Sequence, residues 1–364
     1  MTLDRRWDVN LADLGWSPFF EKHFGELQDA ALRPARVIEE LKGFYRVRGT
    51  EGELLSEISG KIQHDAKTRE DFPAVGDWVA IVPRPEENRA RIERILPRKS
   101  KLARKAAGRA FDEQIVATNL DTVFIVSSLN RELNAKRIER YLALISESGA
   151  RPVVLLNKAD LCADPSPSVA EVSRIARETP IHLLSARGGS GLQAVQNYLL
   201  RGETSAFVGS SGVGKSTLIN RLLAGSVGKQ QRVQEVREED DRGMHTTSSR
   251  QMFFLAGGGI VIDTPGMREL QLWQSETGVA EVFDDVLALA EHCKFRNCNH
   301  RGEPGCAVEA AILAGTLKAE RLESYRKLQA ELRFQERKAD PQVAREDEDK
   351  WKRIHKEMRK KNRP

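Results

Sequence analysis

One glycine-rich stretch constrains the fold of this 364-residue chain more than any other part of the sequence. It reads GSSGVGKST, from Gly209 to Thr217, and it lies between an apolar run, SAFV, and a helix-like run, LINRLL. The pattern G-x-x-x-x-G-K-S at such a junction predicts a phosphate-binding loop, because glycines let backbone N–H groups converge on phosphate oxygens at a helix N-terminus. An α/β sheet is therefore expected, and a glycine-rich turn without a ligand is the alternative.

Every residue of this loop is a predicted nucleotide contact. Lys215 is expected to reach the outer phosphates of the nucleotide, and the hydroxyl of Ser216 is expected to bind Mg²⁺. The complete set is Gly209, Ser210, Ser211, Gly212, Val213, Gly214, Lys215, Ser216 and Thr217.

The sequence on both sides of the loop alternates apolar runs with helical patterns. Runs such as TVFIVSSL and RPVVLLNKAD are followed by amphipathic stretches such as NAKRIERYLALISESG, which favours a parallel, doubly wound sheet. The run RQMFFLAGGGIVIDTPG predicts an antiparallel hairpin that turns at residues 257–259. In such a sheet the ligand-binding loops gather at the carboxyl ends of the strands.

A second motif, N-K-x-D, predicts which base is bound. The Asp160 carboxylate can accept two hydrogen bonds, which matches the adjacent N1–H and 2-amino groups of guanine, whereas adenine offers no such pair on that edge. Asn157 can brace the loop and contact the base, and the stem of Lys158 can cover a ring face. After the next strand, the backbone of Ser185 and Ala186 can offer an N–H to guanine O6. A helix N-cap is the alternative role for Asp160.

Two further motifs complete the set expected of a GTPase. In VIDTPG, Asp263 is expected to hold Mg²⁺ through water, and the Gly266 N–H is expected to contact the γ-phosphate. In GMHTT, Thr246 or Thr247 is expected to offer a hydroxyl to Mg²⁺.

His245, in the same GMHTT stretch, is the predicted catalytic residue. Many GTPases place a glutamine just after the glycine of this motif, where it orients the attacking water. In this chain Met267 follows Gly266, and its side chain has no such donor or acceptor. His245 is the best replacement, in the role of orienting water or touching the phosphates. A solvent-exposed loop histidine is the alternative.

Three of the four cysteines gather with a histidine in CKFRNCNHRGEPGC. The candidate ligands are Cys293, Cys298, His300 and Cys306, and three thiolates with one imidazole suit tetrahedral Zn²⁺. Four protein ligands indicate a closed, structural site for one zinc ion per chain, and metal binding would supply folding energy to a segment with little core. Reduced, unliganded cysteines are the alternative.

The order of these motifs is permuted, because the guanine-reading turn precedes the phosphate loop. With short β-like runs before them and the Cys/His cluster after them, the motifs resemble the RsgA (YjeQ) family of circularly permuted GTPases. The resemblance implies an OB-fold, a permuted GTPase domain and a zinc-binding C-terminal domain. It also implies GTP hydrolysis that is stimulated by the small ribosomal subunit, and a role in the late maturation of that subunit.

The expected architecture is multidomain. Residues 1–35 form an N-terminal extension, and residues 36–112 form an all-β, OB-fold-like RNA-binding domain. Residues 113–278 form the circularly permuted α/β P-loop GTPase domain, and residues 279–364 form an α-helical zinc-binding domain with a basic tail.

Basic charge is concentrated at two places. Residues 84–109 and 350–364 each carry a net charge of +7, although the whole chain carries only +5. Such clusters favour a polyanion partner, here RNA, over a solvated face and a disordered tail. The candidate RNA contacts are Arg98, Lys99, Lys101, Arg104 and Lys105, and in the tail Lys352, Arg353, Lys356, Arg359, Lys360 and Lys361.

The favoured function is a monomeric, cytoplasmic GTPase that hydrolyses GTP with Mg²⁺ and couples this to maturation of the small ribosomal subunit and to its own release. Its expected partners are that subunit with its rRNA, and GTP or GDP. No signal-peptide pattern and no run of ~18 apolar residues occurs, so no membrane partner is expected. The alternative is a GTP-switched RNA-binding assembly factor with incidental hydrolysis. A P-loop kinase is disfavoured because it has no use for the guanine-selecting turn.

Overall fold

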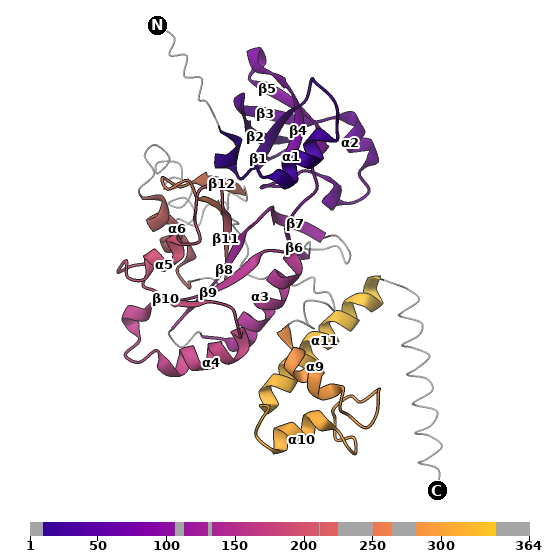
Figure 1. The fold of residues 1–364 in the computed structure, drawn as a ribbon, viewed down its shortest axis with the longest axis vertical. Helices are drawn as coiled ribbons and strands as arrows, with labels where there is room; N and C mark the ends of the chain where they lie inside the picture. Colours follow the sequence, from indigo (N-terminus) through magenta and orange to yellow (C-terminus); the bar gives the residue numbers. More distant parts are fainter. Residues whose placement is uncertain are drawn as a thin grey trace. The chain divides into compact units, whose positions relative to one another are not determined.

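The computed structural model describes residues 10–105, 113–129, 133–210, 212–224, 250–263 and 282–339. These residues belong to two compact units (Figure 1). The first unit contains a barrel and an α/β sheet, and the second contains the C-terminal helices.

Five strands form the barrel of the first unit: β1 (Arg33–Leu41), β2 (Phe44–Gly49), β3 (Gly52–Ile58), β4 (Trp78–Arg84) and β5 (Arg89–Ile95). They pair in the order β1-β2-β3-β5-β4, and a further pairing of β4 with β1 closes the barrel. Alternate side chains fill the interior, among them Val37, Val47, Val79 and Ile92. The predicted OB-like barrel is therefore confirmed, with this strand order giving the five-stranded closure of that fold.

Short helices flank the barrel strands. Before β1 lie η1 (Leu11–Leu14) and α1 (Pro18–Gly25), and between β3 and β4 lie α2 (Gly60–Asp65) and η2 (Arg69–Asp71). The turn η3 (Pro85–Glu87) joins β4 to β5. Aromatic side chains pack on the barrel around Trp78, whose ring centroid lies 5.8 Å from that of Phe20 in α1 and 4.6 Å from that of Trp16 just before α1.

The α/β sheet contains the parallel strands β10 (Ile181–Leu183), β9 (Arg151–Asn157), β8 (Thr122–Ser128), β11 (Thr204–Val208) and β13 (Ile260–Asp263), in that spatial order. Its helices are α3 (Ala135–Ser148), α4 (Ser166–Ala176), α5 (Leu192–Gln196) and α6 (Lys215–Leu223), with the single turn η4 (Ala159–Leu161) after β9. The continuous apolar run of β8 is buried along its whole length, as expected for a strand covered on both faces. The predicted parallel, doubly wound sheet is confirmed.

The predicted hairpin also forms, and it connects the two sheets. Strand β12 (Gln251–Phe254) runs antiparallel to β13, and Leu255 N donates to Gly259 O at 2.8 Å across the turn. On its other side β12 pairs with β1, with Glu39 opposite Gln251, so one sheet continues from the α/β part into the barrel. Strands β6 (Lys101–Lys105) and β7 (Glu113–Thr118) form a separate two-stranded ribbon.

The second unit is helical, as predicted, with α9 (Asp284–Ala290), α10 (Ala307–Leu313) and α11 (Ala319–Ala339). Arg321 of α11 ties this helix to α9 and to the residues just before α9. It donates to both carboxylate oxygens of Asp285 at 3.0 and 3.2 Å and to the carbonyl of Val282 at 2.7 Å, and it lies 4.4 Å over the ring of Phe283. Among all helices described, none combines the length and apolarity that a bilayer crossing requires.

Candidate nucleotide site and metal centre

The predicted nucleotide motifs meet at one edge of the α/β sheet. Asn157 ends β9, Gly209 follows β11, and Asp263 ends β13, and these strands run parallel in one sheet. Because parallel strands share their carboxyl edge, the order of the motifs in the chain does not separate them in space. Asp263 is half-buried at this edge.

The phosphate loop has backbone positions that only glycine fits. Gly209 has φ +142°, and a Cβ there would lie 2.2 Å from the carbonyl oxygen of Val126. Gly214 has φ +98° at the N-cap of α6, and its Cβ would lie 2.3 Å from Nδ2 of Asn157. The loop thus approaches its neighbours so closely that any side chain at either position would displace them.

Lys215 is folded back over the loop. Its ammonium donates to the carbonyl oxygens of Gly209 and Ser210, at 2.7 and 2.6 Å. Ser216 and Thr217 are exposed at the start of α6, next to Lys215. A phosphate that enters the loop would therefore meet a lysine already held at its centre, with two hydroxyl side chains beside it.

Asn157 links this loop to the segments predicted to read guanine. It is 2% exposed, its Nδ2 donates to Val213 O at 2.7 Å, and its Oδ1 accepts the Ala186 N–H at 2.8 Å. One buried amide therefore fixes the phosphate loop, the N-K-x-D turn and the Ser185–Ala186 turn relative to each other. The sequence predicts a bracing role for Asn157, but not which partners it holds.

The geometry of the N-K-x-D turn leaves Asp160 open. Lys158 adopts the left-handed conformation at φ +64°, which turns the chain so that Asp160 lies exposed inside the single turn η4. The Asp160 carboxylate has no hydrogen bond to any described residue, and the helix that follows begins only at Ser166. The alternative role of Asp160 as a helix N-cap is therefore not supported.

The Ser185–Ala186 backbone differs from expectation. Ser185 N donates to Ser190 O at 3.0 Å, and Ala186 N donates to Asn157, so both N–H groups predicted for guanine O6 already have acceptors. The N–H of the next residue, Arg187, has no acceptor in the described part of the chain. No sequence signal distinguishes Arg187 from its neighbours, because the distinction depends on how the turn closes.

Five predicted site residues lie outside the described residues: Ser211, His245, Thr246, Thr247 and Gly266. One contact to the phosphate loop, in contrast, was not predicted. The guanidinium of Arg137, in the first turn of α3, donates to the hydroxyl of Ser210. Arg137 belongs to no motif, so only the packing of α3 beside the loop reveals it.

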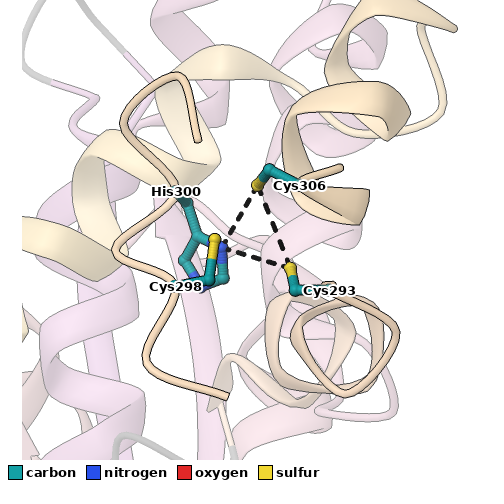
Figure 2. Close-up of side chains that lie close together, drawn as sticks. All are labelled: Cys293, Cys298, His300 and Cys306. Carbon is teal, nitrogen blue, oxygen red and sulfur yellow. Dashed lines mark hydrogen bonds between the residues drawn. The ribbon is translucent and has the colours of Figure 1, made fainter. Parts of the chain in front are cut away.

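The four candidate metal ligands converge in the second unit (Figure 2). All four ligand atoms lie within 4.8 Å of one another, and Nδ1 of His300 lies 3.6 Å from Cys293 Sγ and 3.4 Å from Cys306 Sγ. The ligands come from the segment between α9 and α10, where Cys293 follows α9 closely and Cys306 is the N-cap of α10. Three thiols and an imidazole in so small a volume fit a tetrahedral metal site.

Backbone and charge around the cluster favour metal binding. The N–H groups of Ala307 and Glu309 each donate to a thiol sulfur, Cys293 Sγ and Cys306 Sγ respectively, at 3.4 Å. Burial, with the nearby charge of Arg326, lowers the pKa of His300, so its imidazole is neutral at pH 7 and has a free lone pair.

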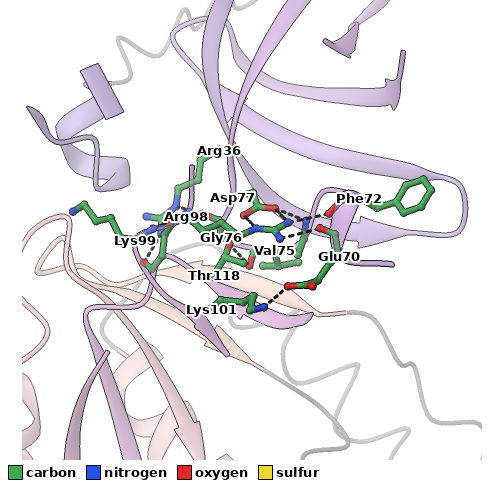
Figure 3. Close-up of polar contacts among 12 residues, drawn as sticks. Arg36, Glu70, Phe72, Val75, Gly76, Asp77, Arg98, Lys99, Lys101 and Thr118 are labelled. Atoms are coloured by element: carbon green, nitrogen blue, oxygen red, sulfur yellow. Dashed lines mark hydrogen bonds and ion pairs between the residues drawn. The ribbon is translucent and has the colours of Figure 1, made fainter. Parts of the chain in front are cut away.

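The basic segment after the barrel has a role that the sequence did not indicate (Figure 3). Arg98 is half-buried and donates to both carboxylate oxygens of Asp77 at 2.8 and 2.7 Å, and to the carbonyls of Glu70 and Phe72. Lys101 forms an ion pair with Glu70. Both side chains therefore have partners within the fold, and their contact with RNA stays a prediction.

The other predicted RNA contacts have different positions. Lys99 is exposed and lies 5.1 Å from the ring centroid of Phe20. The side chains of Arg104 and Lys105 and the basic residues of the tail lie outside the described residues.

Comparison with known proteins supplies the family. A family model described as RsgA GTPase matches residues 95–273. The small ribosomal subunit biogenesis GTPase RsgA of Opitutus terrae is 46% identical over 98% of this chain and 98% of that protein. This chain belongs to the RsgA GTPase family. A second RsgA relative, RsgA 2 of Lactiplantibacillus plantarum, is 47% identical over 82% of this chain and 83% of its own length.

Solved structures show the same fold for this RsgA-family chain. YjeQ from Thermotoga maritima is 29% identical, with 83% of this chain and 98% of YjeQ covered at a TM-score of 0.61. YloQ, described as a circularly permuted GTPase, is 22% identical, with 84% and 96% covered at a TM-score of 0.58. The predicted RsgA resemblance and the circular permutation are confirmed.

Proposed function

We propose that this chain binds the small ribosomal subunit and couples GTP hydrolysis to the late assembly of that subunit and to its own release. The hydrogen bond from Asn157 to Val213 is the observation that best supports GTP binding, because it holds a guanine-selecting turn and a phosphate loop together at one edge of the sheet. The named function of relatives at 46% and 47% identity supports the partner. GTP hydrolysis itself is the activity of the RsgA GTPase family.

In the proposed site, each residue has one task. The exposed Asp160 selects guanine, and Lys215 with the loop N–H groups holds the β- and γ-phosphates. His245 orients the attacking water, in place of the glutamine that Met267 cannot supply. Ser216 and a threonine of GMHTT would hold Mg²⁺, with Asp263 acting through water, and the bound ion would neutralise charge on the phosphates.

We assign the Cys293, Cys298, His300 and Cys306 cluster to one structural Zn²⁺. Four protein ligands leave no open position for catalysis, and thiolates prefer zinc to hard cations such as Mg²⁺. Metal analysis of the purified chain is expected to give one zinc per chain, and well under one would contradict the assignment.

For RNA, the barrel offers a better surface than the basic segment after it. Phe44 is 37% exposed and lines a recess together with Arg84, Arg89 and Arg91, at the β1–β2 and β4–β5 turns where OB-folds bind nucleic acid. Arg84 lies directly opposite Arg89 in the strand register, and facing like charges cost stability. A bound polyanion would relieve that repulsion, and Phe44 can stack on a base.

The proposed division of the chain keeps the boundaries expected from the sequence, with the nucleotide site in residues 113–278 and the metal site in residues 279–364. We further propose that the protein acts as a monomer in the cytoplasm, where its ribosomal partner is assembled.

The partner is tested by sedimentation with isolated small subunits, with large subunits as the control. Binding is expected to be tighter with a non-hydrolysable GTP analogue than with GDP, and to weaken steeply as salt increases. Substituting Arg89→Glu is expected to weaken binding, whereas Arg94→Glu, also exposed on β5 but outside the recess, is not. Equal binding to both subunits, or a flat salt profile, would contradict RNA recognition.

A further inference from the structure

Arg326 of α11 lies beside the metal cluster but is not one of its ligands. Its Nε and Nη2 atoms are buried and have no hydrogen-bond partner within the described residues. The nearest acidic atom is Oε1 of Glu309, 3.9 Å from Nη2. Buried donors without acceptors are rare in folded proteins and unfavourable, so this arginine requires an explanation.

The negative charge of an occupied metal site would explain the buried guanidinium. Three thiolates and a neutral imidazole around a divalent cation carry a net charge of −1. Nη2 of Arg326 lies 3.9 Å from Oε1 of Glu309, whose backbone N–H donates to the ligand atom Cys306 Sγ at 3.4 Å, so the guanidinium is close to the position of that anion. An occupied site would thus give this buried positive charge a nearby negative charge.

Glu309 ties Arg326 to the ligand loop. Its Oε1 accepts the N–H of Gly302 at 2.7 Å, in the loop between His300 and Cys306, and the same oxygen approaches Arg326. The backbone N–H of Glu309 donates to Cys306 Sγ. Arg326, Glu309 and the ligand loop therefore form one connected group that joins α11 to α10.

We propose that Arg326 is a positioning residue of the metal centre, whose charge compensates the anionic metal–thiolate group and holds α11 against it. Metal binding would then fix α11, the helix that leads to the basic C-terminal tail. This inference rests on the proposed occupancy of the cluster by Zn²⁺. Partners outside the ligand shell typically change metal affinity by about 10–100-fold, so the effect is measurable.

The test titrates Zn²⁺ into the reduced, metal-free full-length chain against a chromophoric chelator at constant pH. Arg326→Met, which retains the length but not the charge, is expected to weaken zinc affinity by about 10–100-fold. Arg326→Lys is expected to recover much of the loss, which a purely steric role would not do. Lys327→Met is the matched control at the next position, where the exposed lysine forms an ion pair with Glu323 of the same helix at 2.7 Å.

Wild-type affinity in Arg326→Met, or no recovery in Arg326→Lys, would overturn the proposal. Should Arg326→Met not fold, Arg326→Gln replaces it in the same comparison with the same expectation. Failure of the wild-type chain to bind zinc at all is a different result, because it refutes the assignment of the metal. Hydrogen exchange in α11 is a second readout: zinc is expected to slow it in wild type and not in Arg326→Met.

Discussion

Nδ2 of Asn157 donates to the carbonyl oxygen of Val213 at 2.7 Å, across 56 residues of sequence. Asn157 ends a strand followed by the turn that we propose to read the base, and Val213 belongs to the loop that we propose to hold phosphates. With the second bond from Ala186 N at 2.8 Å, one side chain fixes the proposed base-reading and phosphate-holding segments relative to each other. Nucleotide affinity is therefore expected to depend on this amide even where it makes no contact with the ligand.

Removing the amide tests that dependence. Asn157→Ala loses two buried hydrogen bonds, each of about 1 kcal/mol net, and is expected to weaken GTP binding by about 10–100-fold. Titration with a fluorescent GTP analogue measures it. Asn197→Ala is the control, because Asn197 is exposed and its side chain accepts only from Gln193, at 3.4 Å, in the bonds described. Equal affinity in both variants would show that the loops are held by other contacts.

The open carboxylate of Asp160 predicts a preference within purine nucleotides. Inosine triphosphate lacks the 2-amino group, so one charge-assisted hydrogen bond is lost, and GTP is expected to bind about tenfold or more tightly. Asp160→Ala is expected to bring this ratio close to one, and Asp164→Ala, which removes a nearby carboxylate that caps Ser166, is expected to retain it. Competition binding gives the ratio directly, and an unchanged ratio in Asp160→Ala would remove Asp160 from the base site.

Which features the sequence can predict depends on how far apart in the chain the interacting residues lie. The phosphate loop, the N-K-x-D turn and the metal ligands are local patterns of residue type and spacing, so their place on strands, turns and helices is predictable. The pairing of Glu39 with Gln251 joins segments more than 200 residues apart, and no local pattern specifies it.

The same limit explains why the sequence does not predict the partners of Arg98 within the fold. Its partner Asp77 and the carbonyls it binds are brought together by barrel closure, whereas composition reports only that the segment is basic. A count of charged residues cannot distinguish an arginine that forms an ion pair within the fold from one that is exposed to a partner. The exposed arginines opposite each other at the β4–β5 turn are visible only through strand register.

Arg36 is expected to be a major determinant of the stability of the first unit. Its guanidinium is fully buried and donates to the carbonyls of Leu14, Gly76 and Asn119, which belong to the N-terminal segment, the barrel and the start of the α/β sheet. Arg36→Met leaves those carbonyls without their donor and is expected to lower the free energy of unfolding by about 3 kcal/mol.

Urea denaturation followed by tryptophan fluorescence measures this change. Arg94→Met, at an exposed position of β5, is the matched control and is expected to stay within about 0.5 kcal/mol of wild type. A similar small change for Arg36→Met would mean that water or other donors satisfy the three carbonyls.

The raised pKa of Glu203 predicts that the stability of the folded state depends on pH. Burial and the nearby charge of Asp121 raise the pKa of Glu203 in the folded state. The folded state therefore binds the proton more tightly than the unfolded state, and stability falls as pH rises from the unfolded pKa through the folded one. At neutral pH the ionised Glu203 is destabilising.

Glu203→Gln is accordingly expected to raise the melting temperature at pH 7, and the gain is expected to shrink as the pH approaches 4. Thermal unfolding at a series of pH values measures the difference between variant and wild type. Glu178→Gln, an exposed position with the same charge change, is the control. A gain that is constant with pH would assign the effect to packing and not to ionisation.

The central claim is that this RsgA-family chain is a GTPase whose hydrolysis responds to the small ribosomal subunit. The most direct measurement is phosphate release from GTP by the purified chain, with and without isolated small subunits, for wild type and Lys215→Ala. The account predicts slow turnover by the wild-type chain alone, a clear increase with small subunits but not with large ones, and no increase for Lys215→Ala. Turnover that is the same with and without small subunits would contradict it.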